Sequence, residues 1–373
     1  DEIVADVASN LSQEEKAGGN VNDFMTLMDG HMDEIVVHKA ISSRLEKACA
    51  SLDVAGYNYM AARYEPDSEN YPNRVMVGSE TYPPDIARNW ALVEKLPSVI
   101  GDFTWTGWDY IGEAGVGIPA YRFGEGGFGA QFPCQLAYCG DLDLTGFRRP
   151  LSYYREIVFG LRKEPYIAVQ NPQHYGETLI KTPWVMSDAD ATWNWPGFEG
   201  KPAVVEVYAP GDEVELFLNG KSLGKGKQDY RYLFTFDSVA YEPGILEAVA
   251  SDGSRYKIGT AGQPYQLKLT AIQNPLGTKA DGADMVLYQV EVVDQQGRRC
   301  PLDDRKIHFE LWGEGQWIGG IGTRDNKAMQ RADTQNRDGL LDAANTKNIS
   351  DNYVGSHDLP VECGVCRVLV RTT

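Results

Sequence analysis

The first part of the chain alternates helical and strand-like patterns of apolar side chains. Apolar residues recur at helical spacing over residues 33–49, which predicts a helix there. A second helix is predicted over residues 84–96, because Pro84 and Asp85 suit a helix's first turn. Short apolar runs predict three strands, at residues 52–58, 74–78 and 98–105. Strand–helix–strand units of this kind indicate a parallel sheet with helical crossovers.

From about Tyr166 the helical pattern stops and alternation of apolar and polar residues begins. Three runs alternate as half-buried strands do, at residues 203–208, 213–218 and 245–250. Asn219-Gly220, after the second run, is a strong signal for a tight hairpin. We therefore predict a β-sandwich over residues 166–260.

A further series of strand-like runs begins near Tyr265. It comprises residues 266–271, 285–293 and 306–311, with a turn at residues 294–297. Residues 323–351 are polar and poorly patterned, which predicts a long loop. The chain ends in a strand-like run that no later run can pair with. This series predicts a second, immunoglobulin-like sandwich over residues 261–373, truncated at its C-terminus.

Charge and composition narrow the classes of partner. The 373 residues carry a formal net charge of −18 without a basic cluster, which argues against nucleic acid. No run approaches the roughly 20 apolar residues of a membrane span, so we expect no membrane partner. The start, Asp1 to Val4, lacks the features of a signal peptide. The cytoplasm is slightly favoured, although a longer parent protein that is exported stays open.

Several motif-like signals are better explained by structural roles than by binding sites. Cys363 and Cys366 form a lone C-x-x-C without further zinc ligands, so buried free thiols are expected. The G-x-G-x-x-G at residues 124–129 neither follows a strand nor opens a helix, which favours a loop over a dinucleotide site. The five histidines have no metal-binding spacing. We expect no cofactor and no metal. The tryptophans of the predicted first sandwich fit packing better than sugar binding: Trp184, Trp193 and Trp195.

Polar and aromatic residues follow each of the three predicted strands. They are Tyr57-Asn58-Tyr59, Ser79-Glu80-Thr81 and the run from Trp105 to Asp109. In (β/α) barrels the carboxyl ends of the strands build the active site. A carboxylate beside aromatic side chains is typical of glycoside chemistry, because the carboxylate can attack an oxocarbenium-like centre. The alternative is a structural Glu80 with two core tryptophans.

Four segments in the same order resemble glycoside hydrolase family 2, and within it bacterial β-galactosidases. They are residues 52–60, 74–117, 140–155 and 215–224. The resemblance covers about residues 30 to 320. It implies that residues 1–165 are the C-terminal half of a (β/α)8 barrel, a partial TIM barrel, followed by the two sandwiches. It also implies an exo-acting, retaining β-glycosidase that hydrolyses terminal β-galactosides by double displacement.

The resemblance assigns a role to each candidate residue. Glu80 would be the catalytic nucleophile, and Tyr59 would orient it, although Tyr57 is an alternative. The substrate-binding residues would be Asn58, Trp105, Trp108 and Asp109. The carbohydrate substrate is therefore expected to lie at the ends of the first three predicted strands.

One part of the family pattern is missing. The general acid/base of the family is a Glu preceded by Asn, and no Asn-Glu pair occurs in this sequence. A complete barrel takes roughly 250 residues, more than the first region offers. We therefore expect an upstream half of the barrel, in the same or another chain, and expect this chain alone to be inactive. Glu113 is a less favoured candidate for the acid.

Two other functions stay open at this point. One is a non-catalytic carbohydrate-binding or scaffolding protein, and the other is a degenerate product that never had an acid/base. The sugar, the linkage and the oligomeric state cannot be decided from the sequence.

Overall fold

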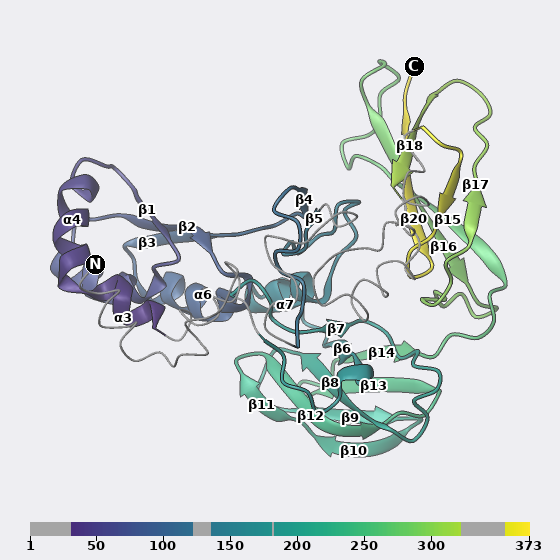
Figure 1. The fold of residues 1–373 in the computed structure, drawn as a ribbon, viewed down its shortest axis with the longest axis horizontal. Coiled ribbons are helices and arrows are strands. Elements are labelled where there is room, and N and C mark those ends of the chain that lie inside the picture. The colour runs from purple at the N-terminus through teal and green to yellow at the C-terminus, as the bar shows by residue number, and fades with distance from the viewer. Residues whose placement is uncertain (1–30, 122–135, 181–182, 322–354) are drawn as a thin grey trace, which may run out of the picture. The chain divides into compact units, whose positions relative to one another are not determined.

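A computed structural model describes residues 31–121, 136–180, 183–321 and 355–373 (Figure 1). The chain forms two compact units, and each is described by itself. The first comprises Asp1–Ala191, Gly200–Tyr241 and Glu247–Lys257, and the second comprises Thr192–Glu199, Glu242–Leu246 and Ile258–Thr373. Among the described residues, no helix has the length and apolarity needed to cross a membrane.

Helices and strands alternate at the start of the first unit. In chain order the elements are α3 (Met32–Val37), α4 (Lys39–Cys49), β1 (Ala55–Asn58), η2 (Ala61–Arg63), α5 (Tyr64–Asn70), β2 (Met76–Thr81), η3 (Pro83–Asp85), α6 (Ile86–Lys95), β3 (Val99–Thr104), β4 (Tyr110–Ile111), β5 (Leu136–Ala137) and α7 (Pro150–Val158). The three predicted strands and the second predicted helix are confirmed, with ends that differ by a few residues.

The predicted single helix over residues 33–49 is wrong, because the chain leaves the helical conformation at His38. The ψ angle of His38 is 141°, which separates α3 from α4. Its ring Nδ1 accepts a hydrogen bond from the amide of Ala40 at 3.2 Å. His38 thus caps the second helix, which the apolar spacing alone does not reveal.

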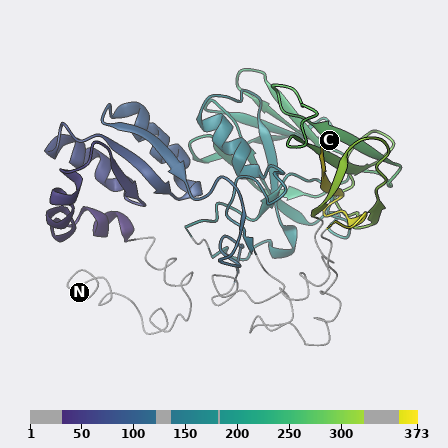
Figure 2. The same cartoon turned by 90° about the horizontal axis from the view of Figure 1, so that it is seen from above.

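The strands β1, β2 and β3 form a parallel sheet in that order (Figure 1). Buried apolar side chains on one face, such as Ala55, Tyr57 and Met76, pack against the helices through Leu45 and Leu92. A second view of the same elements is given in Figure 2. This parallel sheet has three strands, and the described residues do not close a barrel.

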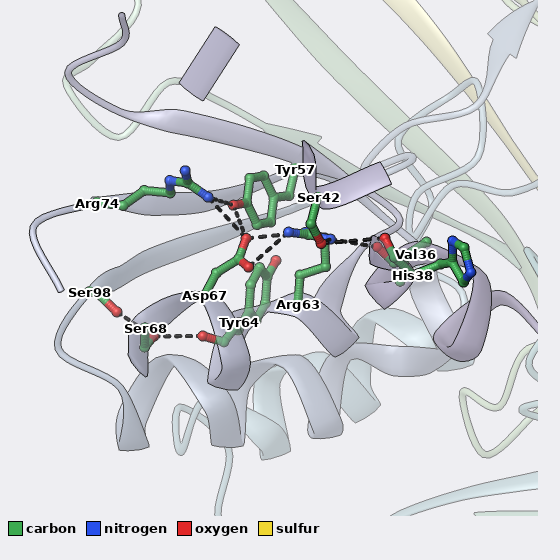
Figure 3. Close-up of polar contacts among 10 residues, drawn as sticks. All are labelled: Val36, His38, Ser42, Tyr57, Arg63, Tyr64, Asp67, Ser68, Arg74 and Ser98. Atoms are coloured by element: carbon green, nitrogen blue, oxygen red, sulfur yellow. Dashed lines mark hydrogen bonds and ion pairs between the residues drawn. The ribbon is translucent and has the colours of Figure 1, made fainter. Parts of the chain in front are cut away.

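A buried polar cluster ties β1 to the helices on that face (Figure 3). Asp67 accepts hydrogen bonds from Arg63, at 2.8 and 3.1 Å, and from Arg74 at 3.1 Å. The Tyr57 hydroxyl also donates to Asp67. Arg63 in turn donates to the carbonyl of Val36 at 2.7 Å. Asp67 and Arg63 are only 3% and 2% exposed, so burying the Asp67 carboxylate is costly. The positive charges of Arg63 and Arg74 offset this cost.

Antiparallel strands follow from Tyr166 onward. They are β6 (Tyr166–Gln170), β7 (Ala189–Asp190), β8 (Pro202–Tyr208), β9 (Val214–Leu218), β10 (Lys221–Lys225), β11 (Lys227–Tyr230), β12 (Leu233–Ala240), β13 (Ile245–Ala250) and β14 (Arg255–Gly259), with the short helix η4 (Pro172–His174) after β6. They make a sheet of order β11-β12-β8-β6-β7 and a sheet of order β10-β9-β13-β14. The change from helical to strand structure is therefore where the sequence predicts it.

The hairpin predicted at Asn219-Gly220 is confirmed. Asn219 and Gly220 have φ angles of 51° and 80°, and Leu218 pairs with Lys221 across the turn. Two consecutive residues in the left-handed region are the requirement of the tightest hairpin turns, and Asn and Gly tolerate it best. Buried and half-buried residues alternate along β9, as the sequence pattern predicts.

The second unit holds the remaining strands. They are β15 (Gln266–Ile272), β16 (Met285–Val293), β17 (Lys306–His308), β18 (Gln316–Ile321), β19 (Asp358–Pro360) and β20 (Val365–Arg371). The final strand, β20, lies inside a sheet of order β15-β16-β20-β18, so it has partners on both sides. β17 is shorter than predicted and pairs with β19. The loop predicted at residues 323–351 lies outside the described residues.

The two cysteines of the C-x-x-C differ in exposure. Cys366 is buried, as predicted, whereas Cys363 is exposed, so the prediction is wrong for Cys363. Cys363 lies in a turn with a φ of 48°, just before the strand that buries Cys366. Of the three tryptophans assigned to packing, Trp193 and Trp184 are buried, at 0% and 8% exposure.

Replacing Asp67 tests the buried cluster. Asp67→Asn leaves two guanidinium groups without their carboxylate, so we expect the free energy of unfolding to fall by about 3–5 kcal/mol. The control is Glu65→Gln, which breaks the exposed pair between Glu65 and Lys95 and should lower the free energy of unfolding far less. Urea unfolding followed by circular dichroism measures both. Equal losses would contradict a stabilising role for the cluster.

Alkaline pH offers a second test of the same cluster. Burial, followed by the hydrogen bond to Asp67, raises the pKa of Tyr57 to about 12. The unfolded chain loses this proton near pH 10, before the folded chain does. The free energy of unfolding should therefore fall between about pH 10 and 12, by up to about 2.7 kcal/mol from this group. Tyr57→Phe should reduce the slope over that range, and the exposed Tyr265→Phe should not.

Candidate active site

The candidate residues gather at the carboxyl ends of the parallel strands. Asn58 ends β1, Glu80 lies near the end of β2, and Trp105 follows β3 directly. Backbone hydrogen bonds join these strand ends. The amide of Tyr59 donates to the carbonyl of Glu80 at 2.7 Å. The amide of Trp105 donates to the carbonyl of Thr81 at 2.8 Å. The structure thus places these predicted residues on neighbouring strands.

A register shift between β1 and β2 brings Asn58 to Glu80. Tyr57 lies opposite Gly78, but the next residue, Asn58, lies opposite Glu80, so that Ser79 is passed over. Side chains alternate between the faces of a regular strand, which would separate Ser79 from Glu80. The irregularity lets both side chains reach Asn58.

Asn58 makes two side-chain hydrogen bonds in this arrangement. Its Nδ2 donates to Glu80 Oε2 at 3.3 Å, and its Oδ1 accepts from Ser79 Oγ at 2.7 Å. Ser79 therefore fixes which end of the amide faces the carboxylate. Sequence reasoning missed this role, although Ser79 stands next to Glu80. A Cβ on Gly56 would come within 2.7 Å of Ser79 Oγ, so the glycine leaves room for this contact.

Tyr59 lies beside Glu80 in an aromatic cluster. Its backbone has a φ of 55°, its ring stacks on Tyr82 at 4.0 Å, and its hydroxyl accepts a hydrogen bond from Trp184 Nε1 at 3.4 Å. Burial, and then the neighbouring Glu80 carboxylate, raise the pKa of the Tyr59 hydroxyl. The hydroxyl therefore keeps its proton and can donate it in a hydrogen bond to Glu80.

Tyr57 does not offer an alternative to Tyr59. Its hydroxyl points to the opposite face of the sheet, where it donates to Asp67 and accepts from Arg74 at 3.0 Å (Figure 3). Because successive side chains of a strand point to opposite faces, Tyr57 cannot reach the carboxylate that Asn58 contacts.

Trp105 is connected to two residues of the following loop. Its indole Nε1 donates to the Tyr110 hydroxyl at 3.2 Å, and that hydroxyl donates to Glu113 Oε2. The peptide between Trp105 and Thr106 is cis. Trp105, Tyr110 and Tyr59 all pack against one buried cluster of Tyr82, Val116, Ala137, Cys139 and Trp184.

Trp108 and Asp109 are placed differently from one another. Trp108 is 51% exposed, and its Nε1 donates to the carbonyl of Leu144 at 3.3 Å. Asp109 is 3% exposed and accepts hydrogen bonds from Arg149 at 2.7 Å and from the amide of Gly140 at 2.8 Å. Burial raises the pKa of the Asp109 carboxyl, and the Arg149 guanidinium opposes this shift. Arg149 also donates to the second oxygen, so both Asp109 oxygens have partners inside the protein. The predicted contact of Asp109 with substrate stays a prediction.

No group of three or more His, Cys, Asp or Glu side chains suited to a metal ion lies within the described ranges. The glycine-rich segment at residues 124–129 lies outside them.

The chain is similar to several known proteins. Residues 267–344 match the family model described as glycoside hydrolase family 2 C-terminal domain 5, and residues 200–256 match a domain of unknown function, DUF4982. A solved family 2 glycosyl hydrolase from Bacteroides cellulosilyticus is 32% identical, with a TM-score of 0.71 over 90% of this chain and 40% of that one.

Two curated relatives carry different activities in their names. The chain is 30% identical over 254 residues to the β-galactosidase BoGH2A of Bacteroides ovatus, covering 66% of this chain and 25% of that protein. It is also 30% identical over 207 residues to a β-glucuronidase of Formosa agariphila, covering 54% and 19%. The chain belongs to glycoside hydrolase family 2. It spans about a quarter or less of the length of these two relatives.

The buried pair of Asp109 and Arg149 can be tested by mutation. Asp109→Asn keeps an acceptor for the Gly140 amide but leaves the guanidinium without a counter-charge. We expect the free energy of unfolding to fall by about 2–3 kcal/mol. Glu156→Gln, which breaks the more exposed pair of Glu156 with Arg148, should cost less than about 1 kcal/mol. Thermal unfolding monitored by calorimetry compares the two variants. If Asp109→Asn leaves the free energy of unfolding unchanged, the pair of Asp109 and Arg149 adds no stability.

Proposed function

We propose that this chain carries the nucleophile side of the active site of a retaining β-glycosidase, with Glu80 as the nucleophile. The observation that carries the proposal is the position of Glu80 at the carboxyl end of β2, hydrogen-bonded by Asn58 and next to Tyr59. A half-buried carboxylate that is held by neutral hydrogen-bond donors is oriented without a cation that offsets its negative charge. It can therefore act on a carbon centre.

In the proposed reaction Glu80 attacks the anomeric carbon of a terminal β-glycoside. The bond to the leaving oxygen breaks as a general acid gives that oxygen a proton, and a covalent glycosyl-enzyme forms. The same group then removes a proton from water, which attacks the anomeric carbon and releases Glu80 with net retention. Asn58 and Tyr59 would hold Glu80 in place, and Trp105 would form the floor of the sugar subsite. Trp108 and Asp109 are proposed to complete the rim of the site.

The general acid is proposed to come from outside these residues. Retaining hydrolysis needs two carboxyl groups about 5–5.5 Å apart. The chain spans only 25% of the β-galactosidase relative, and its parallel sheet has three strands. We therefore infer that residues 1–165 are the C-terminal half of a (β/α)8 barrel that an upstream half completes, in the same or another chain. Residues 166–260 and 261–373 would be the two sandwiches that follow it.

The proposed substrate is a terminal β-galactoside. Family 2 membership supports a carbohydrate substrate, and the β-galactosidase name of one relative supports galactose. The β-glucuronidase name of another relative supports a uronic acid instead. Identity of 30% to both relatives does not separate the two sugars.

Replacing Glu80 tests the proposed nucleophile. In the native polypeptide that contains this chain, Glu80→Gln should lower hydrolysis of an aryl β-galactoside by about 1,000-fold or more, because the covalent step is lost. Glu94→Gln makes the same charge change on the exposed side of α6 and should leave hydrolysis near its original rate. A 2-deoxy-2-fluoro galactoside should add its glycosyl mass to the peptide containing Glu80.

The same assay on this chain alone locates the acid. No turnover by the chain, with turnover by the native polypeptide, supports an acid outside these residues. Sugar binding without any turnover in the native polypeptide would instead support a non-catalytic carbohydrate-binding protein, and the enzymatic proposal would fall.

A further inference from the structure

The loop after β3 presents a carboxylate next to the proposed sugar subsite. Glu113 is exposed, yet its Oε2 accepts a hydrogen bond from the Tyr110 hydroxyl, which accepts one from the Trp105 indole. The backbone amide of Trp105 donates a hydrogen bond to the carbonyl of Thr81, the neighbour of Glu80. A continuous set of contacts therefore runs from Glu113 to the residue beside the proposed nucleophile.

The loop backbone holds Glu113 in this position. Tyr110 pairs with Ala137 where β4 meets β5, and the amide of Gly115 donates to the carbonyl of Leu136 at 3.0 Å. Glu113 has a φ of 43°, in the left-handed region, and its carbonyl accepts from the amide of Val116 at 3.1 Å. The turn therefore aims the carboxylate back at Tyr110.

The charge around Trp105 is negative in the described part of the chain. Neither Glu80 nor Glu113 forms an ion pair with a described Lys or Arg. One described cation near this cluster, Arg149, pairs with Asp109 and lies over the Tyr138 ring at 3.5 Å. Cys139 lies in the buried cluster against which Trp105 packs. Burial, followed by the charge of Asp109, raises the pKa of this thiol to about 12; the charge of Arg149 opposes the shift, and the charge of Glu113 adds to it by less.

We propose that Glu113 is a specificity-determining residue that makes the site accept neutral β-glycosides and disfavour β-glucuronides. A carboxylate accepts hydrogen bonds from the hydroxyl groups of a neutral sugar, whereas it repels the carboxylate of a uronic acid. The hydrogen bond from Tyr110 holds the charge beside the Trp105 ring. This inference rests on the proposed function, because it assumes that a sugar binds over Trp105.

Binding to the native polypeptide with Glu80→Gln tests the inference without turnover. Phenyl β-galactoside and phenyl β-glucuronide are titrated, and tryptophan fluorescence reports binding. We expect the galactoside to bind more tightly, and Glu113→Gln to narrow the ratio of the two dissociation constants by roughly twofold to fivefold, since Glu113 is exposed. The matched control, Glu94→Gln, should not change the ratio.

Ionic strength gives a readout that a purely structural role would not move. Raising it from about 0.05 M to about 0.5 M shortens the screening length from roughly 14 Å to about 4 Å. Higher salt should narrow the ratio of the two dissociation constants in the Glu80→Gln protein. The same change of salt should alter the ratio less once Glu113→Gln is added. Tyr110→Phe, which releases the carboxylate but keeps the charge, should give an intermediate ratio.

Four results would overturn the inference. They are tighter binding of the glucuronide, a ratio of dissociation constants unaffected by Glu113→Gln, no binding of either glycoside, and loss of turnover of every glycoside in a Glu113→Gln variant that keeps Glu80. The last result would make Glu113 the missing acid. If Glu80→Gln abolishes turnover but the ratio is unaffected by Glu113→Gln, the proposed function stands and only the specificity inference fails.

Discussion

The parallel pairing of β1 with β2 is the interaction on which the candidate site depends. One strand serves two purposes there, because its successive residues point to opposite faces. Tyr57 anchors the strand in the buried cluster around Asp67, and Asn58, the next residue, contacts Glu80 on the other face. The register shift at Ser79 is what brings the carboxylate to the amide. The peptide between Tyr57 and Asn58 thus links the buried cluster around Asp67 to the position of Glu80 on the other face.

The aromatic cluster around Tyr82 extends this arrangement to distant parts of the sequence. Trp184 contributes an indole to the Tyr59 hydroxyl across 125 positions of the chain, and Cys139 packs beneath Trp105 and Tyr110. Aromatic rings bury large areas and prefer offset or edge-on contacts, so a few of them can fix several loops at once. The loops that carry the proposed subsite therefore rest on a shared apolar support.

The electrostatics of the site bear on the difference between its two named relatives. A galactoside is neutral and a glucuronide is an anion, so selection between them depends on the charge that faces the sugar. In the described residues the loop after β3 offers Glu113, and Arg149 is occupied by Asp109. Relatives named for a galactosidase and for a glucuronidase match the same chain, and the role proposed for Glu113 would place the choice between the two sugars on a loop.

The sequence by itself determined the order and type of most elements, because apolar periodicity and turn residues act locally. The switch from helices to strands near Tyr166 and the hairpin at Asn219-Gly220 follow from such signals. Family motifs also pointed to Glu80 and Tyr59. Only the tertiary structure decided that Tyr57 turns away, that Asp109 is buried with Arg149, and that Ser79 orients Asn58. These depend on register and on contacts between residues far apart in the chain, which local patterns do not encode.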